Sequence, residues 1–222
     1  SATQNTINLN QDSWSSNFVC LKSCYGTHTI IKEKEFSTIS SEFCIISKVL
    51  FNEAGKWKSL SGAGGEEFDL GYKIRKMNKK NIKLKNAGYS GYWCDLYERS
   101  KRIVHRTEKY IPILFKKKDF DSVGSFATIG QAISSILTFF IIIVLLAKLI
   151  FNFSLFIPIF TLLILVQLLI EIKFLIFSFK EHNLRMLLFS LYGIQMINLS
   201  IMLGGFLFAV KNTIGLPFKK RS

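Results

Sequence analysis

Residues 136–146 read ILTFFIIIVLL, a run of eleven residues with a single hydroxyl group and no charge. The run is the centre of a longer apolar stretch, residues 126–151, whose one charged side chain is Lys148 near the far end. About 20 apolar residues at 1.5 Å per residue cross the hydrocarbon layer of a bilayer. We therefore expect a transmembrane helix over 126–151.

Two more apolar stretches follow, residues 155–179 and 184–210, and a basic tail, residues 211–222, ends the sequence. The breaks between the stretches are only three or four residues long. Consecutive helices should therefore be antiparallel neighbours, packed as a two-helix hairpin with a third helix beside it. The basic residues that flank the spans are nearly equal in number on the two sides, so the positive-inside rule leaves the orientation open.

Charged residues divide the chain into two parts. Of 29 Lys and Arg and 15 Asp and Glu, 21 and 13 lie in residues 1–125. Residues 126–210 hold six charged side chains: Lys148, Glu171, Lys173, Lys180, Glu181 and Arg185. This distribution excludes a simple soluble globule, a disordered chain and a disulfide-dense miniprotein. It indicates a polar domain, residues 1–125, joined to a transmembrane bundle, residues 126–210.

The polar part shows the alternation expected of an antiparallel β-sheet. Apolar residues occupy every second position of 68–74, and the alternation returns at 82–84 after a polar turn, which predicts a hairpin. Further strands are expected at residues 29–34, 43–51, 89–97, 103–106 and 110–115. The predicted fold is an antiparallel β-sheet polar domain followed by a three-helix transmembrane bundle.

Small and amide residues mark the helix faces that should pack within the membrane part. They are Gln167, Gly193, Gln195, Asn198, Gly204 and Gly205. Glycine lets helix backbones approach closely, although it is also common in membrane helices for no special reason. Amides prefer a partner inside a bundle to lipid. Because three helices cannot readily hide all six residues, we expect some of them to face the helices of a partner.

Glu171 and Lys173 are ionisable residues within the second span. Groups of this kind are candidates for a proton relay or an ion site. We favour the simpler alternative that both lie close enough to the interface to extend toward water. A transporter would usually place more than one carboxylate at this depth.

Residues with catalytic or ligand-binding chemistry are few. The glycine-rich stretch 61–65 lacks the Lys-Ser/Thr of a phosphate-binding loop, and His28, His105 and His182 are scattered. The basic run 73–85 could contact nucleic acid or anionic lipid, but such runs are more often a solvated surface. We therefore expect no catalytic residues, no metal, no cofactor and no nucleic-acid partner. We expect the partners to be membrane lipids and other integral membrane subunits.

All four cysteines lie in the polar part: Cys20, Cys24, Cys44 and Cys94. An even number in an exported domain suggests two disulfides, whereas the same number in a reducing compartment carries no such meaning. Four cysteines allow three pairings, which the sequence leaves open.

Two short segments resemble the claudin and peripheral-myelin-protein superfamily, most closely the regulatory γ-subunit-like branch that assists glutamate receptors and calcium channels. Asp12-Ser13-Trp14 is followed six residues after the tryptophan by Cys20. The second segment, Ser90-Gly91-Tyr92-Trp93-Cys94, is similar to the family signature Gly-Leu-Trp-x-x-Cys, and three spans follow it. The first span of the family has no counterpart ahead of Trp14, and the cysteine follows Trp93 directly.

The resemblance implies a small β-sheet domain in which Trp14, Gly91 and Trp93 belong to the conserved pattern and Cys94 bridges to an upstream cysteine. We accordingly predict disulfides Cys20–Cys94 and Cys24–Cys44.

Three functions are compatible with the sequence. The first is a non-enzymatic accessory or contact protein of claudin-like architecture, an auxiliary subunit of a larger membrane complex, with the plasma membrane as the favoured location. The second is a lineage-specific accessory subunit of a mitochondrial respiratory complex in the inner membrane, suggested by residue usage typical of AT-rich coding sequences. The third is a small transporter that uses Glu171. Oxidised cysteines would favour the first, thiols the second, and a polar cavity beside Glu171 the third.

Overall fold

The computed structural model describes residues 13–28, 34–35, 39, 44–57, 66–83, 91–117, 128–151 and 155–213. Within these ranges 82% of the residues are helical. The helices are α1 (Trp14–His28), α2 (Lys48–Glu53), α3 (Glu66–Lys76), α4 (Leu96–Lys117), α5 (Ile129–Ile150), α6 (Phe156–Glu181) and α7 (Leu184–Thr213). Two short strands, β1 (Lys34–Glu35) and β2 (Ile82–Lys83), pair in antiparallel fashion with Lys34 opposite Lys83.

The predicted β-sheet domain is wrong: in the described part of the polar half, strand pairing is limited to these two short strands, and most of the other residues are helical. The predicted strand at 68–74 lies inside α3. Its buried residues, Leu70 and Ile74, are four positions apart, so a short alternation also fits one face of a helix. Acidic residues in the first turn of α3 and basic residues in the last turn favour the helix through its dipole.

The predicted strands at 43–51, 89–97, 103–106 and 110–115 also fail, whereas Lys34, the last residue of the predicted strand 29–34, begins β1. Those at 103–106 and 110–115 both lie within α4, where Leu96, Ser100 and Ile103 are buried with helical spacing. Residues 48–51 belong to α2, and 91–95 have no regular structure before α4 begins. Of the predicted hairpin only β2 forms a strand, and its partner is β1. Residues 29–33, 43, 84 and 89–90 lie outside the described part.

The prediction of three long apolar helices is confirmed, since α5, α6 and α7 are each long and apolar enough to cross a membrane. Their bounds match the predicted stretches closely at both ends, except that α7 continues to Thr213. Thr128 caps α5 by accepting a hydrogen bond from the Gln131 amide at 3.1 Å. Asn183 accepts one from the Met186 amide at 3.0 Å, which explains why a new helix starts directly after α6.

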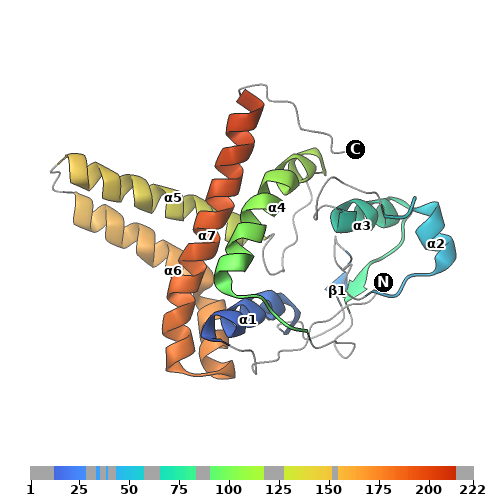
Figure 1. Cartoon of the computed structure of the whole chain (residues 1–222), viewed down its shortest axis with the longest axis horizontal. Helices are drawn as coiled ribbons and strands as arrows, with labels where there is room; N and C mark the ends of the chain where they lie inside the picture. The colour runs from blue at the N-terminus through green and yellow to red at the C-terminus, as the bar shows by residue number, and fades with distance from the viewer. Residues whose placement is uncertain are drawn as a thin grey trace.

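Figure 1 shows how these helices are arranged. The α5–α6 hairpin extends away from α7 to the left and is not parallel to it, while α4 runs along the other side of α7, with α3 and α2 beyond. Helix α1 packs against α4, α6 and α7. The larger hydrophobic core lies where these four helices meet, and it includes Phe18, Leu21, Ile103, Phe174 and Ile197. A smaller core joins α2 and α3 through Leu70, Ile74 and their neighbours.

Candidate functional site

Seven polar side chains from three helices meet inside the membrane part, and we call them the amide layer. They are Gln131, Ser134, Ser135 and Thr138 of α5, Gln167 of α6, and Gln195 and Asn198 of α7. Most of them are buried. On α5 they recur every three or four residues, so they form one polar stripe that faces the other two helices.

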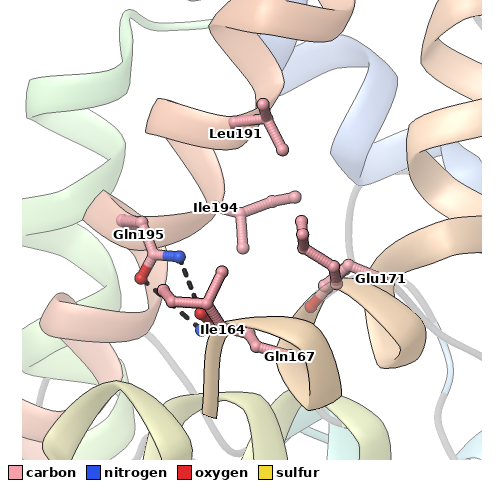
Figure 2. Close-up of a pocket in the computed structure, with 7 residues that line it drawn as sticks. Ile164, Gln167, Glu171, Leu191, Ile194 and Gln195 are labelled. Atoms are coloured by element: carbon pink, nitrogen blue, oxygen red, sulfur yellow. Dashed lines mark hydrogen bonds between the residues drawn. The ribbon is translucent and has the colours of Figure 1, made fainter. Parts of the chain in front are cut away.

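Gln167 and Gln195 form the centre of the amide layer. Gln195 Nε2 donates to Gln167 Oε1 at 2.8 Å, and Gln167 Nε2 donates to Thr138 Oγ1 at 2.7 Å. Thr138 in turn donates to Gln195 Oε1 at 3.2 Å and closes a three-helix ring of hydrogen bonds. Figure 2 shows the two glutamines pointing toward each other from α6 and α7.

Asn198 forms the second group of contacts in the layer. Its Nδ2 donates to Ser134 Oγ at 2.9 Å, and its Oδ1 accepts a hydrogen bond from Gln131 Nε2. Because an unsatisfied polar group costs several kcal/mol in hydrocarbon, these bonds fix which faces of the three helices meet. The structure thus places the three amides that the sequence singles out, Gln167, Gln195 and Asn198, against neighbouring helices within the chain.

The glycines follow the same rule. A Cβ at Gly193 would lie 2.5 Å from the ring of Phe18, and one at Gly204 would lie 2.5 Å from the carbonyl oxygen of Val104. Gly205 has ordinary space, with Ile111 as its neighbour at 3.6 Å. Gly193 and Gly204 thus allow α1 and α4 to pack closely on α7. Their contacts lie within the chain, so these two glycines do not indicate a partner's helices.

A buried ion pair joins α1 to α6. Lys22 Nζ lies 2.8 Å from Glu171 Oε2, and the two side chains are only 5% and 7% exposed. The ammonium group also lies 4.3 Å from the centroid of the Phe174 ring. Removing two charges from water costs several kcal/mol each, and only their close contact offsets that cost. Breaking either partner would leave an uncompensated charge in the core.

Burial acts on the groups of α1 near this pair. It lowers the pKa of Lys22, and the Glu171 carboxylate opposes that shift by stabilising the ammonium form. Tyr25, whose ring lies 5.4 Å from that of Phe174, has its pKa raised by burial and by the negative charge of Glu171. The shift of Lys22 acts against its own ammonium form, whereas the shift of Tyr25 keeps the Tyr25 hydroxyl neutral beside the ion pair.

A small cavity separates the ion pair from the amide layer (Figure 2). Glu171, Gln167 and Gln195 line it together with apolar residues: Ile164, Leu168, Leu191 and Ile194. Its volume is about 30 Å³, enough for one or two water molecules and too small for an organic substrate. The cavity is large enough for water beside Glu171 but too small for a larger reactant.

Glu171 and Lys173 differ, although the sequence treats them alike. Lys173 is exposed on the outer face of α6, as the favoured alternative requires. Glu171 is buried and faces Lys22 of α1. The sequence analysis missed its partner, Lys22. A signal was present, because Lys22 is the one charged residue between Trp14 and Lys32 and thus needs a partner from elsewhere.

The residues of the family resemblance lie apart from this site or serve packing. The ring of Trp14 lies 4.9 Å from that of His182, at the turn between α6 and α7. Trp93 packs partly buried against the larger core, and Gly91 precedes it in the irregular segment before α4. The β-sheet that the resemblance implies does not form in the described part of the chain.

The predicted disulfides are also wrong, because all four cysteines are thiols. Cys20 and Cys24 lie one turn apart on α1 and are fully buried. Cys44 stands just before α2, whose residues Leu50 and Phe51 pack on the smaller core, and Cys94 stands just before α4. The predicted pairs presupposed a sheet that brings these segments together, and helices replace that sheet.

Among the described residues, no group of three or more His, Cys, Asp or Glu side chains could hold a metal ion. The chain matches no family model, and no curated protein or solved structure is detectably similar to it. The function therefore has to be argued from the geometry of this chain alone.

Proposed function

We propose that the protein is a non-enzymatic integral membrane protein that serves as an accessory or contact subunit of a larger membrane complex. The observation that carries the proposal is the set of large apolar side chains left exposed on the polar half. Ile45 and Val49, four residues apart around the start of α2, are 68% and 66% exposed, and Tyr92 and Tyr97 before and in α4 are 75% and 63% exposed. Exposed aromatic and aliphatic groups outside a membrane span are typical of protein contacts.

The interior of the protein supports the same proposal. Glu171 is engaged by Lys22, and the glutamines of the amide layer bond to each other and to Thr138. These groups act as internal connections between helices. The distal half of the α5–α6 hairpin, by contrast, has no buried residue among 142–151 and 155–166, so it offers a long apolar surface to lipid or to the helices of other subunits.

The test compares two substitutions on α2. The tagged chain is extracted from its own cells in a mild detergent, and its native mass is measured. We expect a complex larger than the 25.4 kDa chain, and we expect Val49→Glu to release the chain from it. Lys48→Glu, at the neighbouring exposed position, is the control and should leave the complex intact. A chain that runs as a lone monomer would overturn the proposal.

The second candidate is a small transporter that uses Glu171, and the cavity beside this residue favours it. Its volume would suit a proton or water but no larger cargo. Proton flux into vesicles that contain the purified chain tests this candidate. Flux that Glu171→Gln abolishes, from a variant that still folds, would replace the accessory function by transport.

The state of the cysteines bears on the location of the complex. Four thiols favour a polar half that faces a reducing compartment, which supports the mitochondrial inner membrane, with this half in the matrix, over an exported domain at the plasma membrane. To test this location, the cells are lysed in denaturant without reductant, and the thiols are alkylated. If none of the four cysteines reacts, the plasma-membrane alternative is favoured again.

A further inference from the structure

Helix α7 leaves large apolar side chains exposed in its first three turns and again near its C-terminal end. Its large exposed residues form two groups, one on each side of residues 193–202, where no residue is exposed. Three helical turns separate Tyr192 from Leu203, so both groups lie on one face and form a stripe that is interrupted where the α5–α6 hairpin packs. The exposed residues of the stripe are Leu184, Leu188, Leu191, Tyr192, Leu203 and Phe206. Ser190 and Asn198 on one flank pack on α6 and α5, and Gly193 and Gly204 on another flank pack on α1 and α4.

Helix α4 covers the side of α7 opposite this stripe and runs in the same direction. Val104 and Thr107 contact Gly204, and Lys211 Nζ bonds to Glu108 Oε1. The outer face of α4 is strongly polar. Lys101, Arg102 and His105 are all exposed on it. The two helices together therefore form a plate with one apolar face and one charged face.

This plate does not fit an α7 that crosses the bilayer. Val104 touches Gly204, so Lys101 and Arg102 lie beside the middle of α7, which runs from Leu184 to Thr213. If α7 crossed the membrane, these charges would lie within the hydrocarbon layer. Each charge there costs about 2.5–3.5 kcal/mol on insertion scales. The same charges cost nothing if α4 lies on the water side of a helix that is parallel to the membrane.

The direction of the α5–α6 hairpin agrees with an α7 that lies parallel to the membrane. Its buried residues lie in the first half of α5, up to Ile141, and in the second half of α6, from Gln167. The remaining half of the hairpin projects from α7 on the side away from α4 (Figure 1). Ten residues, 142–151, extend about 15 Å at 1.5 Å per residue. The projecting stretches, 142–151 and 155–166, are apolar apart from Lys148 and Thr161.

We propose that the α5–α6 hairpin alone enters the hydrocarbon layer, and that α7 lies in the membrane interface with its apolar stripe against the lipid. The stripe would contact the boundary between the lipid headgroups and the acyl chains. Lys180 and Arg185, which are exposed at the α6–α7 turn, would pair with anionic headgroups. Two passages through the hairpin return the chain to the side from which it came. The segments before α5 and after α7 thus share one side, whereas three spans would separate them. This inference does not rest on the proposed accessory function.

Depth measurements along α7 distinguish the two arrangements. Nitroxide labels are placed one at a time at Leu188→Cys, Leu199→Cys and Phe206→Cys in the full chain, with the four native cysteines replaced by alanine. The chain is reconstituted in vesicles of phosphatidylcholine and phosphatidylglycerol, and collision rates with oxygen and with a water-soluble nickel complex give the depth. We expect one shallow depth, about 5–10 Å below the headgroups, at all three positions. A label at Leu199 that is clearly deeper than the other two would overturn the proposal.

Two reference labels calibrate these depths. Leu149→Cys in the hairpin should be deep, and Lys101→Cys on α4 should be in water. A deep Lys101 label would contradict the proposal as directly as a deep Leu199 label.

A second measurement keeps the native cysteines, in case the alanine background does not fold. Epitope tags at the two ends of the chain are exposed to protease in sealed vesicles. We expect both tags to be cleaved or both to be protected, and cleavage of only one tag would establish three spans.

Discussion

The two halves of the α5–α6 hairpin differ in their polar residues and in their environments. The proximal half, residues 131–141 and 167–178, places six hydrogen-bonding side chains against α7: Gln131, Ser134, Ser135, Thr138, Gln167 and Ser178. The distal half, residues 142–151 and 155–166, has no hydrogen-bonding side chain buried and no buried residue at all. In a membrane protein the polar side chains therefore specify how helices pack, because lipid competes equally well for the apolar ones.

This comparison predicts that polar and small residues of the proximal half will be sensitive to substitution, and that apolar residues of the distal half will not. Four predictions test it, and the free energy of unfolding, measured by adding SDS to mild-detergent micelles, is the common readout.

The largest effect is expected from breaking the ion pair. Glu171→Leu leaves Lys22 buried without its counter-charge and should lower the free energy of unfolding by about 3–5 kcal/mol. It should also expose the buried thiols Cys20 and Cys24 to alkylation, because α1 is no longer held. The double variant Lys22→Met, Glu171→Leu should recover most of the loss. A single variant as stable as the double variant would show that the pair does not hold α1.

The next effect concerns the crossing of α1 and α7. Gly193→Ala places a Cβ 2.5 Å from the Phe18 ring, and such overpacking should cost about 1–3 kcal/mol. Gly205→Ala is the matched control, since its nearest neighbour, Ile111, is at 3.6 Å. The control should be neutral or slightly stabilising, because alanine favours helix over glycine. Equal effects at the two glycines would contradict the close approach of α1.

A smaller loss is expected within the amide layer. Gln167→Leu removes the bonds to Thr138 and Gln195 and leaves both groups without this partner in the interior. The expected cost is about 1–2 kcal/mol, since hydrogen bonds between membrane helices contribute modestly and a lost partner adds a desolvation penalty. Adding Gln195→Leu should restore part of the stability, and full additivity of the two losses would contradict a direct contact.

The smallest effect is expected in the distal half. Leu162→Ala removes a side chain that is 61% exposed and should change the free energy of unfolding by less than about 0.5 kcal/mol. Leu175→Ala makes the same change on the same helix at a residue that is only 5% exposed, and it should cost about 2 kcal/mol or more. Similar losses at the two positions would remove the distinction between the two halves of the hairpin.

The sequence predicts the long apolar helices well because their signal extends over some 20 residues, and no competing pattern shares it. The alternation at 68–74 extends over only seven residues, and Leu70 and Ile74 fit a helix face equally well. Local sequence could not separate the two, and packing on α2 decided in favour of the helix. The same ambiguity affected 103–106 and 110–115 in α4.

The candidate site was predicted in part. Gln167, Gln195, Asn198 and Glu171 stand out in the sequence because a polar group in an apolar span needs a partner. What the sequence could not supply is the identity of each partner. Lys22 is separated from Glu171 by 149 residues, and no local pattern connects them.

That separation also sets the order in which the protein can mature. Helix α1 leaves the ribosome first, yet its counter-charge at Glu171 and its docking position at Gly193 are made last. At about 5–20 residues per second, Lys22 waits roughly 7–30 s before Glu171 has been synthesised. During that time the apolar surface of Phe18, Leu21 and their neighbours has no native partner from α6 or α7. A chaperone or the membrane surface itself must protect this nascent segment until translation is complete.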